Sequence, residues 1–331
     1  MFTQGSQMWM GGVHATNLIE VTDDASQLDD GSFWAISISF EGKPTFARFA
    51  DVTKNEFPKT TWESLGKRWM SSLSQSEYIS YVSTIREIIA AGGVYQVNAC
   101  RQLHHTMTGA NQSLAGLFSE LLLRNPAEFA CYLKVGDLEI ASASPELFLK
   151  RRGYTVTSSP IKGTRRTGGA DFGSKDTAEN VMIVDLIRND LGQICKDGTI
   201  DVPRLLGIEE HPGIDHLVSD VTGELKENLS WRQIIEPLLA PGSVSGAPKS
   251  SAVKIIEQHE KNRGIYCGAI GWIQGDACDL AVAIRTFWKD EQILKFGTGA
   301  GITWASDAAS EWEETELKAE RLIKIASGEI S

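Results

Sequence analysis

The order in which strand-like and helix-like segments follow one another most limits the fold of this 331-residue chain. Between residues 129 and 159, short apolar or alternating runs are separated by Gly or Pro, which is the pattern of a strand meander. Further strand-like runs cover Tyr266–Ile273, Leu280–Trp288 and Ile293–Gly297. Because the strands cluster and do not alternate one by one with helices, the pattern favours an α+β fold over a doubly wound parallel sheet.

Helical patterns lie between and after these clusters. Ser76–Ala91 has apolar residues at helical spacing, with a serine at its start and two glycines after its end. The chain length suggests about two domains, and the polar, proline-bearing Thr53–Thr61 is the candidate linker. The other predicted helices are Ser113–Arg124, Ser174–Cys195, Ser230–Leu239, Lys249–Lys261 and Ala308–Ala326, and the other predicted strands are Phe33–Phe40, Tyr95–Leu103 and Leu217–Thr222.

The charge balance is acidic, since 32 lysines and arginines face 43 aspartates and glutamates, for a net charge of −11. Nucleic acids and anionic membranes are bound by clustered cations, so this balance argues against both partners. No run reaches the roughly 20 apolar residues of a membrane helix, and the N-terminus lacks the basic and apolar regions of a signal peptide. Five scattered cysteines without a CxxC pair indicate neither a disulfide framework nor a zinc site. We therefore expect a soluble cytoplasmic protein.

Two pairs of acidic residues are spaced three apart in predicted helices. Asp176 and Glu179 form one pair, and Glu311 and Glu314 form the other. This spacing places each pair on one helical face. If the two faces meet, they form an all-oxygen site suited to Mg²⁺. Taken alone, each pair is more typical of a solvated helix face or of negative charge near a helix N-terminus.

Two glycine-rich segments invite comparison with phosphate-binding loops. Gly297–Ile302 (GTGAGI) would let backbone N–H groups approach an anion, but its GxGxG spacing is not that of a dinucleotide fingerprint. Gly242–Ser250 (GSVSGAPKS) also fails, because Lys249 lacks a glycine at the required spacing. We reject nucleotide binding for both segments. Each segment alone is also compatible with a turn that needs unusual backbone angles.

Three lysine or arginine residues lie in sequence contexts that are unusual for a charge that only contributes to solubility. Lys162 lies in PIKGTRRTG, between an apolar-proline entry and a glycine exit, although a solvent-facing loop lysine fits equally well. Arg285 lies inside AVAIRTFW, so burial on a strand is expected, and a buried guanidinium needs an anionic partner. Lys318 follows Glu314 by one helical turn and adds positive charge. The six histidines form no HxxxH or HxH pattern, which argues against zinc; His216 alone is typical of a structural residue.

Together these motifs resemble the chorismate-utilising enzymes from about residue 75 to the C-terminus, and their number and order make the resemblance specific. It implies that family's single α+β unit, with two large packed β-sheets surrounded by helices. Residues 75–331 would then form the catalytic region, and residues 1–74 a shortened β-rich segment packed on it. The motifs are SPELFL (Ser144–Leu149), PIKGTRRTG (Pro160–Gly168), DTAENVMIVDLIRNDLG (Asp176–Gly192), DHLVSDVTGEL (Asp215–Leu225), PGSVSGAPK (Pro241–Lys249), RGIYCGAIGW (Arg263–Trp272), AIRT (Ala283–Thr286), GTGAGI, and EWEETELKAE (Glu311–Glu320).

Few positions separate the branches of this family. Isochorismate and salicylate synthases carry a lysine base where this chain has Gln96, which cannot act as that base. Anthranilate synthase large subunits read PIAGT, whereas this chain reads PIKGT. The lysine form is similar to the aminodeoxychorismate synthase component I branch, which makes 4-amino-4-deoxychorismate for 4-aminobenzoate and folate. Anthranilate synthase component I is the alternative enzyme, and a catalytically silent binding or scaffold relative is the alternative of another class.

The chain departs from the family pattern at two places. The region before residue 75 is shorter than in full-length members, which leaves the tryptophan pocket of the longer relatives unassigned. Arg166 replaces the usual proline of GTRP, and we expect this change to alter only the shape of the loop.

The resemblance assigns roles to individual residues. Lys162 is the expected covalent nucleophile, and Glu146 the general acid that protonates the leaving hydroxyl. Glu179 and Glu314 are expected to bind Mg²⁺ directly, with Asp176 and Glu311 acting through water. No glutaminase nucleophile is visible near any cysteine, so a separate glutamine amidotransferase subunit is implied. The expected contacts to chorismate are Gln96, Thr164, His216, Tyr266, Arg285, Gly299, Ala300, Gly301 and Lys318.

Overall fold

The computed structural model describes residues 5–107, 113–169, 171–211 and 214–330, without the side chains of Thr164, Ser174, Lys175 and His211. The described residues form one hydrogen-bonded sheet of 18 strands. The strands are β1 (Gln7–Met10), β2 (Val13–Thr22), β3 (Phe33–Ile38), β4 (Pro44–Lys54), β5 (Met70–Ser71), β6 (Gln96–Thr106), β7 (Phe129–Val135), β8 (Leu138–Ser144), β9 (Leu147–Arg152), β10 (Thr155–Ser159), β11 (Ile161–Arg166), β12 (Asp201–His211), β13 (Ile214–Glu224), β14 (Gly246–Ala247), β15 (Ala269–Gln274), β16 (Ala277–Val282), β17 (Thr286–Asp290) and β18 (Ile293–Ile302).

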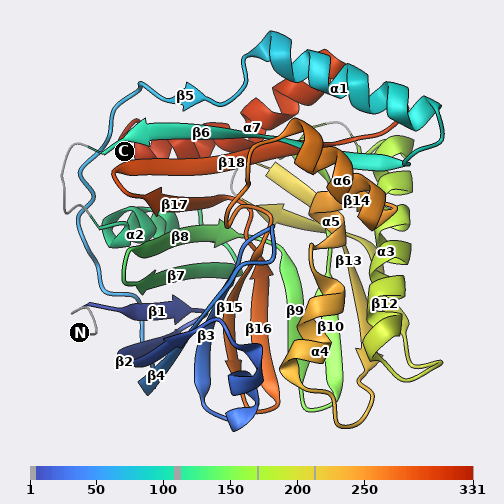
Figure 1. Ribbon diagram of the computed structural model, residues 1–331. Coiled ribbons are helices and arrows are strands. Elements are labelled where there is room, and N and C mark those ends of the chain that lie inside the picture. Colours follow the sequence, from blue (N-terminus) through green and yellow to red (C-terminus); the bar gives the residue numbers. More distant parts are fainter. Residues whose placement is uncertain (1–4, 108–112, 170, 212–213, 331) are drawn as a thin grey trace.

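Antiparallel pairings link the strands in the order β5-β6-β18-β17-β8-β7-β1-β2-β4-β3-β15-β16-β9-β10-β13-β12, with β11 also beside β13 and β14 beside β6. Figure 1 shows β6, β18, β17, β8 and β7 running across the view, whereas β3, β15, β16 and β9 run steeply below them. The α+β class is confirmed. The two sheets expected from the resemblance are parts of one curled sheet, because hydrogen bonds through β1, β2 and β4 join them.

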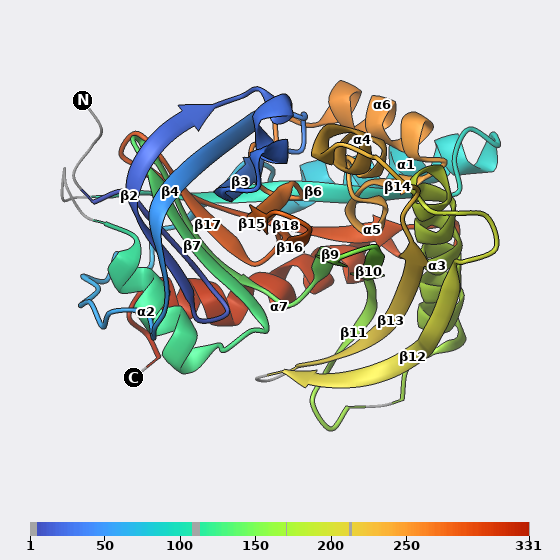
Figure 2. The ribbon, with the colours of Figure 1, turned by 90° about the horizontal axis from the view of Figure 1, so that it is seen from below.

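Helices cover the sheet where the sequence predicts them. The Ser74 hydroxyl accepts from the backbone N–H of Glu77 and the Glu77 carboxylate accepts from the N–H of Ser74, so a capping box starts the first helix. Figure 2 shows β11, β12 and β13 curving away from the rest of the sheet, with α3 along one side of them. The helices are α1 (Gln75–Ala90), α2 (Ala115–Arg124), α3 (Ser174–Ile194), α4 (Trp231–Ile235), α5 (Gly242–Ser245), α6 (Lys249–His259) and α7 (Ala308–Ala326), with the 3-10 turns η1 (Ala25–Asp30) and η2 (Glu236–Leu238).

The observed strands differ from the expected pattern at three places. The run Leu280–Trp288 is not one strand but two, β16 and β17, because the chain breaks at Arg285, whose φ is +50°. The glycine-rich Gly297–Ile302 is not a turn but the end of β18, where it pairs with β6. Strand β12 was not predicted, because Asp201–His211 lacks an apolar alternation.

The N-terminal strands belong to the same sheet as the rest of the chain. β1 pairs with β7, and β3 pairs with β15. Residues 55–69, which overlap the predicted linker, form neither helix nor strand. The division at residue 74 stays a prediction. Among the described helices, none is long and apolar enough to cross a membrane.

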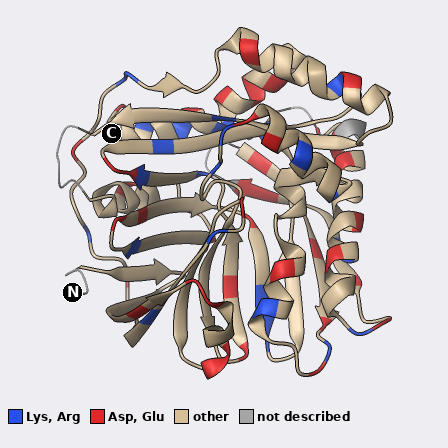
Figure 3. Ribbon diagram, in the orientation of Figure 1, with Lys and Arg blue, Asp and Glu red and all other residues tan. Residues whose placement is uncertain are grey.

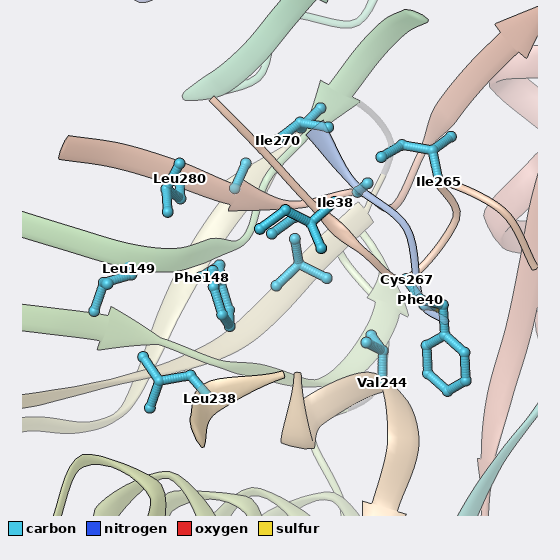
Figure 4. Packing of buried hydrophobic residues seen from close by; sticks show 14 of the residues in the cluster. Ile38, Phe40, Phe148, Leu149, Leu238, Val244, Ile265, Cys267, Ile270 and Leu280 are labelled. Atoms are coloured by element: carbon cyan, nitrogen blue, oxygen red, sulfur yellow. The ribbon is translucent and has the colours of Figure 1, made fainter. Parts of the chain in front are cut away.

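A large apolar core packs beneath the strands and against the short helix α5. Figure 4 shows Ile38, Phe148, Ile270 and Leu280 packed together, with Val244 of α5 close by. These side chains are at most 6% exposed. Burying one such side chain stabilises a fold by about 1.5–3 kcal/mol. The start of β9 and the short helix α5 are thereby fixed relative to each other.

Candidate active site

One cavity of about 890 Å³ gathers most of the residues that the sequence selects. Its wall comes mainly from β11, α3, β18 and α7. Gln96, Ala300 and Glu311 are buried but are not part of this wall. The side chain of Thr164 lies outside the described part of the structure, and its backbone pairs with His216. The selected residues that line the cavity are Glu146, Lys162, Asp176, Glu179, His216, Tyr266, Arg285, Gly299, Gly301, Glu314 and Lys318.

The glycines of β18 are explained by close approach and not by backbone angle. A β-carbon on Gly297 would lie 2.1 Å from the ring of Tyr266. A β-carbon on Gly301 would lie 2.6 Å from Gln96 Nε2 and 3.1 Å from Lys162 Nζ. Contacts this short do not occur with real side chains without movement of the neighbours. Glycine at these positions therefore lets the cavity reach the strand itself.

Lys162 lies on β11 beside Gly163, where the pairing of β11 with β13 is irregular. Gly163 has φ +86°, a conformation that favours glycine, and a β-carbon there would lie 3.2 Å from Asp176 Cβ. The close packing of β11 on α3 therefore sets the direction of the lysine. Burial lowers the pKa of Lys162, although Glu179 acts in the opposite direction. A lowered pKa favours the neutral amine, which is the nucleophilic form.

Glu146 lies between β8 and β9 and is 2% exposed. The Ser243 hydroxyl donates a short hydrogen bond to its Oε1, and the backbone N–H of Glu146 donates to Ser144 Oγ at 3.2 Å. Burial raises the pKa of Glu146 to about 7, although the Ser243 hydrogen bond and Lys162 both act to lower it. A large fraction of this carboxyl group is therefore protonated near neutral pH, as a general acid requires.

Arg285 turns out of the sheet at the break between β16 and β17. Its guanidinium contacts His216 Nε2, and among the described residues it makes no ion pair with a carboxylate. Burial lowers the pKa of Arg285 to about 10, with Glu146 acting in the opposite direction. The group is still a cation at neutral pH, so it is available to bind an anionic ligand.

Lys318 carries a second positive charge into the cavity. Its Nζ lies 2.6 Å from Glu314 Oε1 and donates to the carbonyl oxygen of Gly299 at 3.0 Å. Burial alone would lower the pKa of Lys318, but Glu314 and Glu311 outweigh it, so the net shift is upward. This lysine is therefore charged at neutral pH.

Carboxylates from α3 and α7 face the cavity from two sides. Asp176 accepts from the backbone N–H of Gly173 at 2.9 Å, and Glu179 accepts from Gln96 Nε2 at 3.1 Å. Such oxygen ligands suit Mg²⁺ in kind. In the described part of the chain, however, no three candidate ligands lie close enough to hold one ion, and Glu314 is paired with Lys318. The carboxylate oxygens are ligands of the kind that magnesium prefers, but among the described residues they are not arranged around a single ion position.

Ser243 is a cavity residue that the sequence did not indicate. It is 4% exposed, lines the cavity and contacts Glu146. It lies in the PGSVSGAPK motif, which identified the family but suggested no role for this serine. In the same motif Lys249 pairs with buried Asp190 at 2.7 Å, so this lysine is structural.

Comparisons with known proteins agree with this arrangement. Residues 21–324 match the family model described as chorismate binding enzyme. The chain is 35% identical over 272 residues to anthranilate synthase component 1 of Aquifex aeolicus, covering 78% of this chain and 54% of that protein. It is 32% identical over 292 residues to aminodeoxychorismate synthase component 1 of Escherichia coli, covering 84% of this chain and 64% of that protein. The chain thus spans between about half and two thirds of the length of these two relatives.

Solved structures share the fold. The crystal structure of anthranilate synthase component I from Streptococcus pneumoniae superposes with a TM-score of 0.82 at 21% identity, covering 98% of this chain and 93% of that one. The menaquinone-specific isochorismate synthase of Escherichia coli gives a TM-score of 0.80 at 17% identity, covering 97% of this chain and 88% of that one. The curled antiparallel sheet and the cavity residues define the class, and the chain belongs to the chorismate-binding enzyme family. The expected resemblance is confirmed at that level.

Proposed function

We propose that this protein is an aminodeoxychorismate synthase component I, which replaces the 4-hydroxyl of chorismate with an amino group. The observation that carries the proposal is Lys162, a buried amine of lowered pKa that lines the same cavity as the protonatable Glu146. An amine and an acid on one cavity suit a substitution in which a nucleophile attacks while a hydroxyl leaves.

Binding of the dianionic substrate is assigned to the cationic and glycine-rich side of the cavity. Arg285 and Lys318 offer two charges to a carboxylate, and the backbone around Gly299–Gly301 can approach it closely. Tyr266, packed on Gly297, supplies an adjoining surface. His216 fixes the guanidinium of Arg285 through their contact. This grouping would let a chain of net charge −11 bind an anion.

The first step is attack by the neutral amine of Lys162 on C2 of the ring. As the N–C2 bond forms, both double bonds of the ring diene shift (C1=C2 to C6=C1 and C5=C6 to C4=C5) and the C4–O bond breaks. Glu146 gives its proton to the departing hydroxyl, which leaves as water. Ser243 holds the carboxyl group of Glu146 in place for this transfer.

The second step reverses the shift. Ammonia forms a bond to C4, both double bonds move back, and the bond from C2 to Lys162 breaks, releasing the neutral lysine amine. The new ammonium group returns one proton to the Glu146 carboxylate, which regenerates the acid. The net change replaces one hydroxyl with one amino group and releases one water. Two successive displacements leave the amine para to the ring carboxylate.

A magnesium ion and a partner subunit complete the proposal. Glu179 and Glu314 would hold the ion directly, with Asp176 and Glu311 acting through water. When bound, Mg²⁺ would act as a Lewis acid on the ring carboxylate. Ammonia is scarce at neutral pH, so we assign its supply to a separate glutamine amidotransferase subunit. The names of the two relatives, each a component 1, support a second component.

Product analysis tests the proposal. The protein is incubated with chorismate, Mg²⁺ and an ammonium salt, and the products are separated and identified by mass and fluorescence. We expect 4-amino-4-deoxychorismate, which retains its enolpyruvyl group. Anthranilate, recognised by its fluorescence and its loss of pyruvate, would contradict the proposal.

Anthranilate synthase component I is the second candidate, because several relatives of comparable identity carry that name. Lys162 separates the two, since the anthranilate branch has alanine at this position of the PIKGT motif. A catalytically silent relative is disfavoured, because all the expected acids and the lysine are present. Absence of any chorismate turnover would favour it.

A further inference from the structure

A second cavity, of about 670 Å³, meets the candidate active site at two cations. Arg285 and Lys318 line both cavities, so they lie between the two spaces. The outer wall of the second cavity is formed by α7, by Arg166 of β11 and by Ile214 of β13. This cavity plays no part in the mechanism described above.

The second cavity is strongly positive for so acidic a protein. Five of its eleven described lining residues are lysine or arginine, and one is glutamate. That carboxylate, Glu320, is shared, since it lies 2.6 Å from Lys324 and 3.5 Å from Arg166. Arg321 donates to the main-chain carbonyl of Arg124 at 3.1 Å, and a carbonyl carries no formal charge. Positive charge therefore exceeds negative charge along this wall.

The α3 side of the active site has the reverse sign. Asp176 and Glu179 of α3 line that side, and Figure 3 shows acidic residues recurring along α3. A dianion approaching from α3 would be repelled unless a cation were bound there, whereas one approaching past α7 would be attracted. The field across the cavity thus favours one direction of approach.

We propose that the second cavity is the entry port through which the anionic substrate reaches the active site. Its ligand is a small organic dianion with an apolar body, because apolar Ile214, Leu317 and Leu322 lie among the cations. This inference rests on the proposed function for the identity of that dianion as chorismate. A carboxylate is first attracted by Arg166 and Lys324 and then passes to Arg285 and Lys318.

The port gives Arg166 a role that the sequence did not suggest. The expectation was that this arginine, in place of the usual proline, alters only the shape of the loop. Its side chain is 68% exposed and lines the second cavity, near Glu320. An exposed guanidinium at the mouth of a cavity raises the local concentration of anions, and its effect falls as salt rises.

The test compares two double variants with the same change in net charge. Arg166→Glu with Lys324→Glu reverses the charge of two side chains that line the port. Arg188→Glu with Arg232→Glu is the matched control, since both residues are half-exposed or more, each pairs with a carboxylate three or four positions away in the chain, and neither lines a cavity described above. Chorismate association is followed by stopped-flow tryptophan fluorescence, and chorismate consumption with ammonium gives kcat and kcat/KM.

For the port variant we expect the association rate constant and kcat/KM to fall about tenfold at low salt, with kcat changed less than about twofold. The loss should shrink toward zero at about 0.5 M salt, where screening is strong. The control should change less than about twofold throughout.

Equal behaviour of the two double variants would overturn the port, as would a loss that is independent of salt or confined to kcat. The readout is chorismate binding, so it does not depend on which product forms. If the wild-type protein neither binds nor consumes chorismate, the proposed function fails and the port fails with it. If the wild type binds chorismate but the port variant matches the control, the port alone fails.

Discussion

Removal of the Ser243 hydroxyl should change the pH at which Glu146 loses its proton. In the native protein, burial sets the pKa of Glu146 at about 7 against the opposing effect of the Ser243 hydrogen bond. A hydrogen bond to a charged group contributes about 1.5–3 kcal/mol, and one pKa unit corresponds to about 1.4 kcal/mol. Because Ser243→Ala stabilises the carboxylate less, the pKa of Glu146 should rise by about one to two units.

The sign of the effect on rate follows from the role proposed for Glu146 as the general acid. A general acid must carry its proton, so activity should fall as pH rises through its pKa, by about tenfold for each unit. The fall should begin near pH 7 in the wild type and about one unit or more higher in Ser243→Ala. The assay is kcat/KM for chorismate between about pH 6 and about pH 9, with the concentration of free ammonia held constant.

Two controls isolate the effect. Ser245→Ala removes another buried hydroxyl of α5, which donates to the carbonyl of Pro241 and not to Glu146; its profile should match that of the wild type. Glu146→Gln should abolish most of the activity and with it the descending limb. A Ser243→Ala profile whose descending limb stays in place, or moves to lower pH, would refute the reasoning.

Three further changes have expected outcomes. Glu179→Gln or Glu314→Gln should abolish Mg²⁺-dependent turnover while circular dichroism stays unchanged, because each removes a charged ligand; near wild-type activity would refute the metal assignment. With glutamine as the sole nitrogen source, the isolated chain should form no product, yet it should be active with ammonium at high pH. Gly297→Ala should lower the free energy of unfolding by about 1–3 kcal/mol or more in urea titrations, since its β-carbon would overlap the ring of Tyr266; an unchanged midpoint would contradict this packing.

Much of the fold could be predicted because the local patterns are strong. The amphipathic pattern and serine start of α1, and the pattern of α7, gave bounds within one residue of those observed. The sequence did not predict the break between β16 and β17. Ala283 and Ile284 continue an apolar run, and a positive φ is rare for an arginine such as Arg285. The joining of the two expected sheets depends on pairings between distant strands, which periodicity does not encode.

The sequence predicted those site residues that lie in a recognisable motif. Lys162 and Glu146 were chosen from PIKGT and SPELFL, and they line one cavity. Gly299 and Gly301, expected to let the backbone approach an anion, line the same cavity, and the alternative of a turn is wrong because Gly297–Gly301 belongs to β18. The contact of Ser243 with Glu146 joins residues 97 positions apart, which no local pattern reveals.

The carboxylates show a second limit of sequence reasoning. Helical spacing brought Asp176 and Glu179 to the cavity from α3, and Glu314 from α7. The same spacing is compatible with an ion pair between Glu314 and Lys318, one turn further along α7, and the structure has this pair at 2.6 Å. Whether Glu314 binds a metal or Lys318 also depends on the carboxylates that α3 brings to the cavity, and the spacing within α7 does not give their position.

The central claim is that Lys162 forms a covalent bond to the substrate, and intact-mass spectrometry tests it most directly. The wild-type protein is mixed with chorismate and Mg²⁺ in the absence of ammonia and glutamine. The reaction is quenched, and the intact mass of the protein is measured. We predict an adduct of chorismate less one water, mapped by peptide analysis to Lys162 and absent from Lys162→Ala. If no adduct forms on protein that makes 4-amino-4-deoxychorismate once ammonia is added, Lys162 is an electrostatic contact and the covalent mechanism is wrong.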